Sequence, residues 1–515
     1  MSDWDVVIVG AGTSGCPLAA RLADAGRRVL LLEAGADHAR PEDFPAALRD
    51  PARMAAAVPG ATANWNLTGT LAPGLTADVP RGRVVGGSSA LNAGYFIRGT
   101  RADFDAWAAA GNHLWSYDRV LPAFRRLEAD ADYGDRPEHG SSGPIPVART
   151  ADGGPLAEAF AAAAAELGFP EEPDKNTDAA PGYGPVPLTT AGGLRVNTAM
   201  AYLSPRRAHP GLTVRGGVHV RRVVAANGRA IGVETSEGVV RAAEVVLSAG
   251  TVGSAHLLLL SGIGPADQLR TAGIDVVADL PGVGADFTDH PNVYVGYRPA
   301  RPLPAGRLPL HGVLNATSAG ASLPGDLEVL PWLTPFHRIT GGPAGPTADE
   351  LVVGVGLQRE DSRGQLTLDG VDPLRQPRLD YRYLTAESDR RRLREGVRLA
   401  ADLLRTRALR PLVGARTGLS DDVLADDRAL DAWVRSHLTT AIHSCGTARM
   451  GPDTDPGAVV DPELRVRGVA GLRVVDTSVL PQAPARGPAA TAVMLGERAA
   501  ELMTADRTAG PPSGA

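Results

Sequence analysis

The stretch DVVIVGAGTSGCPLAARLADAGRRVLLLEAG, residues 5–35, decides the fold that we expect for this chain. Its pattern predicts a buried strand, a glycine turn, a helix with one apolar side and a second buried strand. Two parallel strands joined by a helix form a βαβ unit. We therefore expect an α/β protein that begins with a Rossmann-like domain.

The turn in this stretch carries Gly10, Gly12 and Gly15 in the spacing GxGxxG. The first glycine of such a turn permits the tight bend, and the second lets a pyrophosphate approach the backbone at the helix N-terminus. Glu33 ends the second strand, where a carboxylate accepts hydrogen bonds from a ribose hydroxyl and repels a 2′-phosphate. Together these features predict a dinucleotide site, although the turn itself does not distinguish FAD from NAD.

Length and composition indicate a globular protein of two domains, or of one domain with a large insertion. The chain has 515 residues, which exceeds the ~250 to 300 residues at which single cores stop growing. Its net charge of −6 offers no basic surface for nucleic acid. No apolar run approaches the ~18 residues of a membrane span, so no transmembrane segment is expected. Residues 5–9 already form a strand, and only two cysteines are present, so a cytoplasmic protein is expected.

The remaining patterns divide the chain into strand-rich and helix-rich parts. Residues 51–100 are rich in glycine, proline and small residues, and we expect an extended path there without helix or sheet. Residues 212–249 alternate as strands do, with turn signals between them, and lead into a helix. Residues 386–438 are expected to be mostly helical.

Residues 81–100, RGRVVGGSSALNAGYFIRGT, offer backbone donors and small side chains to a flat polar group. This stretch resembles the first signature of the glucose-methanol-choline (GMC) flavoprotein oxidoreductases, and AGTVGSAHLLLLSGIGP at 249–265 resembles the second. WSYDRVLPAF at 115–124, HSCGTARMG at 443–451 and LRVVDTSVLPQAPARGPAATAVMLGERAA at 472–500 are similar to the family as well. The resemblance spans about residues 4–503 in collinear order.

The resemblance implies an FAD-binding domain, a substrate domain built on an antiparallel sheet plus helices, and oxidation of an alcohol by hydride transfer to flavin N5. The expected FAD-binding parts are residues 1–130, 206–295 and 441–505. The expected substrate-domain parts are residues 131–205 and 296–440, and residues 506–515 are expected to be a disordered tail.

The resemblance also implies, motif by motif, which residues contact FAD. These residues are Gly10, Gly12, Thr13, Ser14, Gly15, Glu33, Ala34, Arg83, Gly87, Ser88, Asn92, Ala93, Val220, Ala249, Gly250, Asp476, Thr477 and Thr491. Some family members attach FAD covalently through a histidine just before the asparagine. Leu91 stands at that position here, so we expect FAD to be noncovalent.

His443 and Cys445 lie two residues apart and raise three hypotheses. A zinc site needs several Cys or His ligands at short spacing, and none joins this pair, so no metal is expected. A cysteine nucleophile needs a base and an oxyanion site, so Cys445 is expected to be a small packed residue. His443 matches the family's active-site histidine, and a neutral imidazole is suited to accept the hydroxyl proton as hydride leaves carbon.

One position departs from the family pattern. A second histidine or asparagine usually lies beside the flavin, and counting from Pro484 places Ala489 there. Either His443 works with a water or another side chain such as His437, or the chemistry has changed. We expect His437, His290 and the acidic residues of DFTDH to be structural. Arg486 is expected either to place positive charge near the flavin or the substrate, or to be a surface arginine.

Three classes of function follow from the resemblance. The leading hypothesis is an FAD-dependent alcohol dehydrogenase or oxidase with a small-molecule alcohol as substrate and an unknown electron acceptor. A second is a dehydrogenase of the branch associated with the peptide-derived redox cofactor mycofactocin, which would pass electrons to a respiratory acceptor and lie peripheral to the membrane. A third is a hydroxynitrile lyase or a flavin-binding protein without redox activity. The sequence does not name the substrate.

Overall fold

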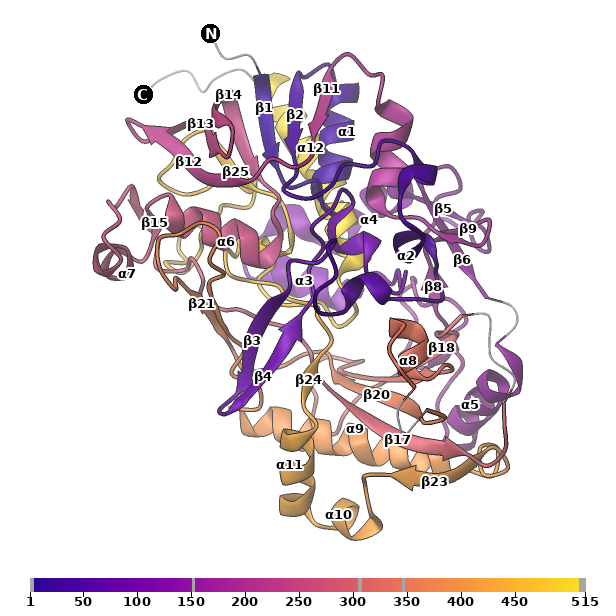
Figure 1. Ribbon diagram of the computed structural model, residues 1–515. Coiled ribbons are helices and arrows are strands. Elements are labelled where there is room, and N and C mark those ends of the chain that lie inside the picture. Colours follow the sequence, from indigo (N-terminus) through magenta and orange to yellow (C-terminus); the bar gives the residue numbers. More distant parts are fainter. Residues whose placement is uncertain (1–3, 151–152, 304–307, 345–347, 509–515) are drawn as a thin grey trace.

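The computed structural model describes residues 4–150, 153–303, 308–344 and 348–508 of the chain. Its first large sheet has seven strands, with the bounds β1 Trp4–Val9, β2 Val29–Leu32, β11 Leu212–Arg215, β12 Val220–Ala226, β13 Arg229–Thr235, β14 Gly238–Leu247 and β25 Leu472–Val474. Their order is β11-β2-β1-β14-β13-β12, with β25 beside β14. This sheet draws its strands from three distant parts of the chain (Figure 1).

The centre of this sheet is parallel and buried on both faces. Strand β1 pairs in parallel with β2 through Val6 and Val29 and with β14 on its other side. Helix α1, Gly15–Asp24, connects β1 to β2 and packs against α12, Ala489–Thr508. Parallel strands covered by helices on both faces have near-continuous apolar sequences, as DVVIV and VLLL do. The βαβ unit predicted from residues 5–35 is confirmed.

The second large sheet is antiparallel and lies below the first in the view of Figure 1. Its strands are β7 Tyr183–Pro185, β17 Pro291–Pro299, β18 Gly312–Ala316, β19 Leu327–Trp332, β20 Leu351–Leu357, β23 Val413–Thr417 and β24 Thr439–Thr440. Their order is β23-β17-β20-β19-β18-β7, with β24 beside β17. The long helix α9, Glu387–Arg405, packs on one face of this sheet against β17, β19 and β20.

Shorter elements connect the two sheets. The remaining α-helices are α2 Ala46–Arg49, α3 Arg101–Ala109, α4 Tyr117–Leu127, α5 Gly154–Glu166, α6 Gly250–Leu260, α7 Ala266–Thr271, α8 Phe336–Thr340, α10 Asp421–Ala425 and α11 Asp427–Ser436. The remaining strands are β3 Leu67–Ala72, β4 Leu75–Val79, β5 Glu128–Asp130, β6 Ile145–Arg149, β8 Pro187–Leu188, β9 Thr190–Ala191, β10 Leu194–Arg195, β15 Ile263–Gly264, β16 Ala278–Asp279, β21 Gln365–Thr367 and β22 Arg378–Asp380.

Residues 51–100 differ from the expectation of an extended path without sheet. Strands β3 and β4 form a hairpin there and join β22 and β21 in a four-stranded sheet. The hairpin turns at Gly74, whose φ of 78° lies in the left-handed region that glycine adopts without strain. The prediction was wrong because the glycine and proline content of this segment hid the alternation of exposed and buried residues in LTGTLA and LTADV.

Two expected boundaries also differ from the structure. The boundary at residue 295 falls inside β17, which begins at Pro291 and belongs to the second sheet. Helix α12 continues to Thr508, and Asp506 pairs with Arg473 at 2.5 Å, so the tail predicted from residue 506 starts too early. Residues 509–515 of that tail lie outside the described residues.

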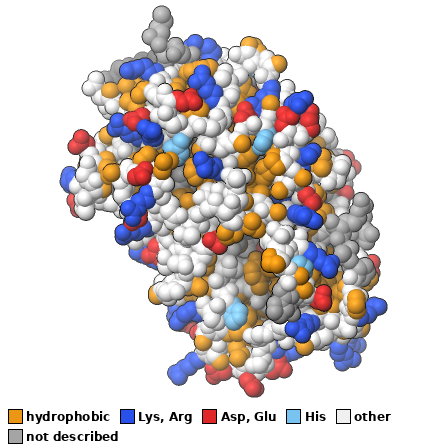
Figure 2. Space-filling view, in the orientation of Figure 1, with side chains coloured by type: hydrophobic (Ala, Val, Ile, Leu, Met, Phe, Trp, Pro, Cys, Tyr) orange, Lys and Arg blue, Asp and Glu red, His pale blue; other side chains and the backbone are white. Residues whose placement is uncertain are grey.

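The surface carries charges of both signs. Figure 2 shows acidic and basic side chains interspersed over the visible face, with apolar side chains scattered between them. Among the described helices, none combines the length and the apolar character that crossing a membrane requires.

Candidate active site

A cavity of about 840 Å³ is lined by residues of both large sheets. On one side it meets the turn after β1 and the start of α6, and on the other it meets strands β17, β19 and β20. In an α/β sheet, ligands bind outside the carboxyl ends of the parallel strands, where these turns lie. The cavity therefore occupies the position that the glycine turn predicts for a nucleotide ligand.

The three glycines of the turn have different surroundings. A Cβ atom on Gly10 would lie 2.4 Å from the carbonyl oxygen of Ser248, and one on Gly15 would lie 2.0 Å from the carbonyl oxygen of Gly10. A Cβ atom on Gly12 would meet no protein atom closer than 3.8 Å. Gly10 and Gly15 are thus required by packing, whereas Gly12 leaves space at the cavity wall for a ligand that approaches the backbone.

Glu33 lies at the end of β2 with its carboxylate in the cavity wall. Its two oxygens accept hydrogen bonds from the backbone N–H groups of Ala11, at 3.0 Å, and Gly35, at 2.9 Å. Only 6% of the residue is exposed, and burial raises the pKa of its carboxyl to about 7. A carboxylate oriented in this way keeps lone pairs for the hydroxyl groups of a ribose.

Most of the predicted cofactor residues line this one cavity. They are Gly10, Gly12, Thr13, Ser14, Glu33, Ala34, Gly87, Ser88, Asn92, Ala93, Val220, Ala249, Gly250, Asp476 and Thr477. Three predicted residues are not among its lining: Gly15 packs inside the turn, Arg83 is exposed with its guanidinium 5.1 Å from the Trp65 ring centre, and Thr491 is buried in α12.

Asp476 connects the C-terminal part of the chain to the start of α6. Its Oδ2 accepts hydrogen bonds from the backbone N–H of Gly250, at 2.9 Å, and from the hydroxyl of Ser254, at 2.5 Å. The N-terminus of α6 thus faces the cavity beside Gly250 and Thr251. Free N–H groups at a helix N-terminus favour an anionic ligand group.

His443 lies in the cavity wall and contacts a second histidine. Its Nδ1 is 2.9 Å from Nδ1 of His290, and the two ring planes meet at 83°. A Cβ atom on Gly487 would lie 3.2 Å from Nε2 of His443, so this glycine leaves the other ring nitrogen uncovered on that side. Burial, together with the charge of Arg81, lowers the pKa of His443 to about 3, and burial also lowers the pKa of His290 well below its usual value. Both imidazoles are therefore neutral near pH 7.

Asp289 holds the two histidines in this arrangement. Its Oδ1 accepts hydrogen bonds from the backbone N–H groups of both His443 and His290, each at 2.7 Å. Its Oδ2 accepts a hydrogen bond from the hydroxyl of Ser444 at 2.7 Å, and Arg81 donates to the same hydroxyl. One buried carboxylate thus fixes the backbone at both imidazoles.

The structure places the imidazole of His290, which was expected to be structural, against the imidazole of His443. Strand β17 begins with Pro291, which pairs with Thr440 of β24, so residues 289–290 lie beside residues 441–443. Two segments about 150 residues apart come together through this pairing, which no local pattern reveals. His437 instead stacks on Trp433 at 4.3 Å between ring centres and is not among the residues that line the cavity.

Arg486 lies on the loop that leads into α12, and Ala489 is the first residue of that helix. Ala489 lines the cavity, as expected for the position that lies beside the flavin in the family pattern. Arg486 is only 2% exposed, so its interpretation as a surface arginine was wrong. Its guanidinium donates hydrogen bonds to the carbonyl oxygens of Gly325 and Ala485, at 3.2 and 2.7 Å. The guanidinium is not part of the cavity lining.

Cys445 is fully buried, and its thiol donates a hydrogen bond to the carbonyl oxygen of His443 at 3.2 Å. Burial raises the pKa of this thiol, which keeps it in the unreactive protonated form. This environment agrees with a packed residue and disagrees with a nucleophile.

Glu128, Asp130 and His139 have donor atoms close enough together to surround a metal ion. Hydrogen bonds from His139 to Asp130, Asp174 and Glu128 outweigh the effect of burial and raise its pKa to about 10. Its ring is therefore protonated near pH 7 and lacks the lone pair that a metal ligand needs. Arg98 and Arg149 pair with the carboxylates, at 2.6 and 2.8 Å, so the group is a buried ion-pair cluster.

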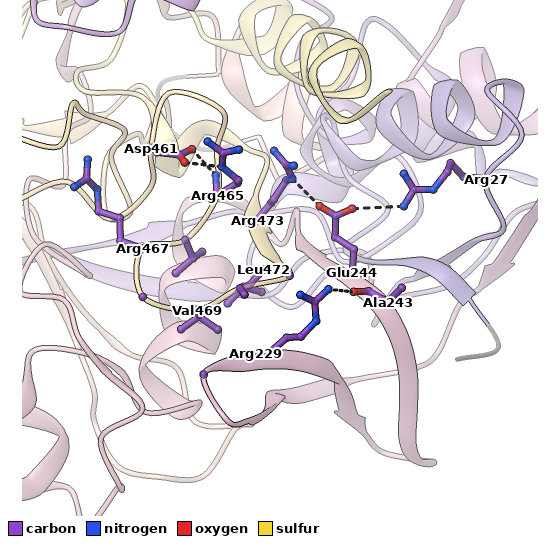
Figure 3. A pocket seen from close by; sticks show the side chains of 15 residues that line it. Arg27, Arg229, Ala243, Glu244, Asp461, Arg465, Arg467, Val469, Leu472 and Arg473 are labelled. Carbon is purple, nitrogen blue, oxygen red and sulfur yellow. Dashed lines mark hydrogen bonds and ion pairs between the residues drawn. The ribbon is translucent and has the colours of Figure 1, made fainter. Parts of the chain in front are cut away.

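A second depression of about 750 Å³ lies at the opposite end of the first sheet's strands and is lined by arginines (Figure 3). Arg473 pairs with Glu244 at 2.7 Å, and Arg27 approaches the same carboxylate at 3.5 Å. Arg465 pairs with Asp461 at 2.7 Å. Because these charges neutralise one another, this depression is a weaker candidate for a ligand site than the cavity at His443.

Comparison with known proteins agrees with the geometry. Two models of the GMC oxidoreductase family match residues 4–292 and 360–496. The chain belongs to the GMC oxidoreductase family. The resemblance inferred from five motifs, and the α/β fold that it implied, are thereby confirmed.

Individual relatives cover nearly the whole chain. An uncharacterized GMC-type oxidoreductase of Rhodococcus erythropolis is 40% identical over 98% of this chain and 98% of its own length. An oxygen-dependent choline dehydrogenase of Photobacterium profundum is 34% identical over 99% of this chain and 94% of its own length. Pyridoxine 4-oxidase from Mesorbium loti has a similar structure, with a TM-score of 0.89, 31% identity and coverage of 97% and 99%. A fungal aryl-alcohol oxidase follows with a TM-score of 0.86, 27% identity and coverage of 99% and 100%.

The family membership and these relatives show that the chain is an FAD-dependent oxidoreductase that acts on alcohol-type substrates. Their named activities concern different alcohols, so the family alone does not select a substrate for this chain.

Proposed function

We propose that this GMC oxidoreductase oxidises a CH–OH group of an alcohol, with His443 as the base that accepts the hydroxyl proton. The observation that carries the proposal is the neutral imidazole of His443 in the wall of the cavity that the glycine turn also lines. A neutral imidazole is the form that accepts a proton, and it must reach the substrate hydroxyl at about 2.6 to 3.2 Å.

The residues of the cavity fit FAD. Gly12 leaves the space that a pyrophosphate needs, Glu33 offers its carboxylate to a ribose, and the N-terminus of α6 offers N–H groups beside Asp476. Bound there, FAD supplies the acceptor for the hydride. Leu91 lines the cavity at the position where some relatives carry a linking histidine, and its apolar side chain forms no covalent bond, which supports noncovalent FAD.

His290 selects the tautomer of His443 in this proposal. The contact between the two Nδ1 atoms requires one to donate and the other to accept. When His443 donates from Nδ1, its Nε2 carries the lone pair that faces the substrate. His290 thus takes the place of the second family residue, which is Ala489 here, but acts on the base rather than on the substrate.

The test is anaerobic reduction of the bound flavin by a panel of primary alcohols, followed through the visible absorbance of the flavin. Loss of a positioned base typically slows such a reaction ~100- to 10,000-fold, so His443→Ala should bind FAD normally and reduce it far more slowly. His290→Ala should slow reduction by about 10- to 100-fold, the usual effect of a residue that orients another. Cys445→Ser is the control and should change the rate little. Near-normal reduction in His443→Ala would show that His443 is not the base.

The same experiment separates the other two hypotheses. A hydroxynitrile lyase would leave the flavin oxidised with every alcohol of the panel, and it would instead split an added cyanohydrin into an aldehyde and hydrogen cyanide without bleaching the flavin. A dehydrogenase of a large redox cofactor would show no reduction with small alcohols and would need the space above Ala489, so Ala489→His would abolish its activity.

We further propose that residues 4–130, 206–290 and 441–508 form the FAD-binding domain, which the membership of the first sheet supports. Cys16 and Cys445 are buried free thiols, which supports a location in the reducing cytoplasm.

A further inference from the structure

Residues 195–198 lie behind the cavity and contact the loops that line it. Arg195 is the second residue of β10 and is fully buried. Thr198 is buried as well, with 1% of the residue exposed. Neither residue is part of the cavity lining, so each acts on a bound ligand only through the loops that it contacts.

The guanidinium of Arg195 joins two separate segments of the chain. Its Nη1 donates a hydrogen bond to the backbone carbonyl oxygen of Asn92. Its Nη2 donates to the backbone carbonyl oxygens of Asp50, at 2.7 Å, and Arg53, at 2.8 Å. Asn92 lines the cavity itself, and Arg53 is followed by Met54, which also lines it. One side chain therefore fixes two parts of the cavity wall.

The first of these segments, residues 47–59, forms a strap along the cavity. Its lining residues are Met54, Ala57, Val58 and Pro59. Apart from the end of α2 and one 3-10 turn, the strap has no regular secondary structure. The position of the strap therefore depends on contacts with other segments, such as its hydrogen bonds with Arg195.

The charge of Arg195 is buried without a direct ion pair. Among the described residues no carboxylate pairs with its guanidinium, and its hydrogen bonds all go to backbone carbonyl oxygens. Burial lowers the pKa of Arg195 to about 10, with the charge of Asp50 opposing this shift, so the guanidinium keeps its charge near pH 7. A buried cation is costly when no anion balances it. The positive charge therefore acts on the peptide groups that it contacts.

The peptide group between Asn92 and Ala93 is one of these. Arg195 binds its carbonyl oxygen. Its N–H belongs to Ala93, which lines the cavity, and forms no hydrogen bond within the described part of the chain. A hydrogen bond from a cation to the carbonyl oxygen polarises a peptide group and makes its N–H a stronger donor. Arg195 thus prepares a donor in the cavity wall for an electron-rich group of a ligand.

Thr198 links the two glycine-containing turns from the same side. Its hydroxyl lies 3.4 Å from the carbonyl oxygen of Gly12 and 3.1 Å from the hydroxyl of Ser89, and both of these residues line the cavity. Asn197 fills the space beside Gly86, where a Cβ atom would lie 2.8 Å from its Oδ1. This short segment therefore supports several parts of the cavity wall at once.

We propose that Arg195 is a positioning residue for the flavin: it fixes the strap and the peptide between Asn92 and Ala93 in the geometry that binds FAD, and it strengthens the Ala93 N–H as a donor to the flavin. Reduced flavin is richer in electrons than oxidised flavin, so a stronger donor favours the reduced form. Arg195 therefore raises both the affinity for FAD and the reduction potential of the bound flavin. This inference rests on the proposed placement of FAD in the cavity and is independent of the alcohol that is oxidised.

The first test is the affinity for FAD, measured by quenching of flavin fluorescence as the apoprotein is titrated. Removal of a hydrogen-bonded charge should weaken FAD binding in Arg195→Gln by roughly 10- to 100-fold. Arg206→Gln is the matched control, because Arg206 lies nearby in the chain but pairs with Asp24 at a partly exposed site. Loss of that pair should change the affinity little.

The second test is the two-electron reduction potential of the bound flavin, measured by equilibration with a reference dye. Reduced FAD should lose roughly tenfold more affinity than oxidised FAD in Arg195→Gln, which corresponds to a fall of about 30 mV. A merely structural role would weaken both forms equally and leave the potential unchanged. Arg195→Lys keeps the charge but cannot reach both segments with one nitrogen, so it should retain most of the potential and lose part of the affinity.

Amide hydrogen exchange of the wild-type protein tests the proposal even if the variants do not fold. Residues 195–203 should be protected already in the apoprotein, whereas the strap and residues 86–94 should gain protection when FAD binds. Exchange in the strap that does not respond to FAD, or an unprotected segment 195–203 in the apoprotein, would contradict a preformed anchor.

The outcomes separate this inference from the proposed function. Unchanged FAD affinity in folded Arg195→Gln, or lowered affinity with an unchanged potential, would overturn the role of Arg195 and leave alcohol oxidation intact. FAD affinity that is insensitive to Gly12→Ala as well would instead overturn the placement of FAD in the cavity.

Discussion

At the scale of single residues, the chemistry depends on how burial sets the charge of His443. An exposed histidine has a pKa of about 6.5, whereas burial and the charge of Arg81 lower the pKa of His443 to about 3. Asp289 binds the backbone N–H of His443 and leaves the imidazole to His290. The side chain is therefore a neutral proton acceptor through the whole physiological range.

This shift predicts the pH dependence of flavin reduction. The base acts in its neutral form, which exists above its pKa, so kcat/KM should be flat from about pH 8 down to about pH 5. A histidine with an ordinary pKa would instead lose activity as the pH falls below about 6.5. The measurement is anaerobic flavin reduction across this range with an alcohol that does not itself titrate. A fall in kcat/KM centred near the ordinary histidine pKa would contradict the assigned environment of His443.

At the scale of elements, the strand, turn and helix of residues 5–35 offer a matched pair of substitutions. Gly12→Ala adds a methyl group that meets no protein atom closer than 3.8 Å, so the fold should persist while FAD binding weakens strongly. Gly15→Ala places its methyl group 2.0 Å from the carbonyl oxygen of Gly10, so the fold itself should be destabilised. The measurements are FAD content and the unfolding midpoint of the FAD-free protein. Equal loss of stability in both variants would refute the distinction.

The ion-pair cluster around His139 predicts a second effect at this scale. The pKa of His139 is raised to about 10, above its unfolded value, so its contribution to stability is complete below about pH 6.5 and is lost as the pH rises toward 10. His139→Gln should reduce the free energy of unfolding by ~3 to 5 kcal/mol at neutral pH, because it removes one cation of the buried cluster and leaves its carboxylates to Arg98 and Arg149 alone. Denaturant unfolding is measured at about pH 7 and about pH 9.5. The free energy of unfolding should fall less between these two pH values in the variant than in the wild type. An identical pH dependence in both proteins would exclude this role.

Elements also show what the sequence could and could not predict. The βαβ unit was predictable because its strands are buried on both faces and its glycines are fixed by contacts within the turn. The hairpin of β3 and β4 was missed because the glycines and prolines spread over residues 51–100 suggested a path without sheet. The contact of His290 with His443 could not be predicted, because it exists only through the pairing of β17 with β24.

At the scale of the whole molecule, two sheets supply complementary halves of one cavity. The parallel sheet brings the glycine turn, Glu33 and the start of α6 to one end. The antiparallel sheet brings Tyr294, Glu328 and its aromatic neighbours to the other. His443 and His290 lie where the chain passes between the sheets, at the pairing of β24 with β17. The base, the cofactor site and the cavity wall formed by the antiparallel sheet thus depend on segments from nearly the full length of the chain.

The central claim is that hydride leaves an alcohol carbon for the bound flavin while His443 takes the proton. It is tested most directly by anaerobic flavin bleaching with an alcohol deuterated at the carbinol carbon, in the wild-type enzyme and in His443→Ala. We predict that the alcohol bleaches the flavin, that deuterium slows bleaching in the wild type, and that His443→Ala is slower still with either isotope. Product formation without bleaching, or bleaching at an unchanged rate in His443→Ala, would contradict the account.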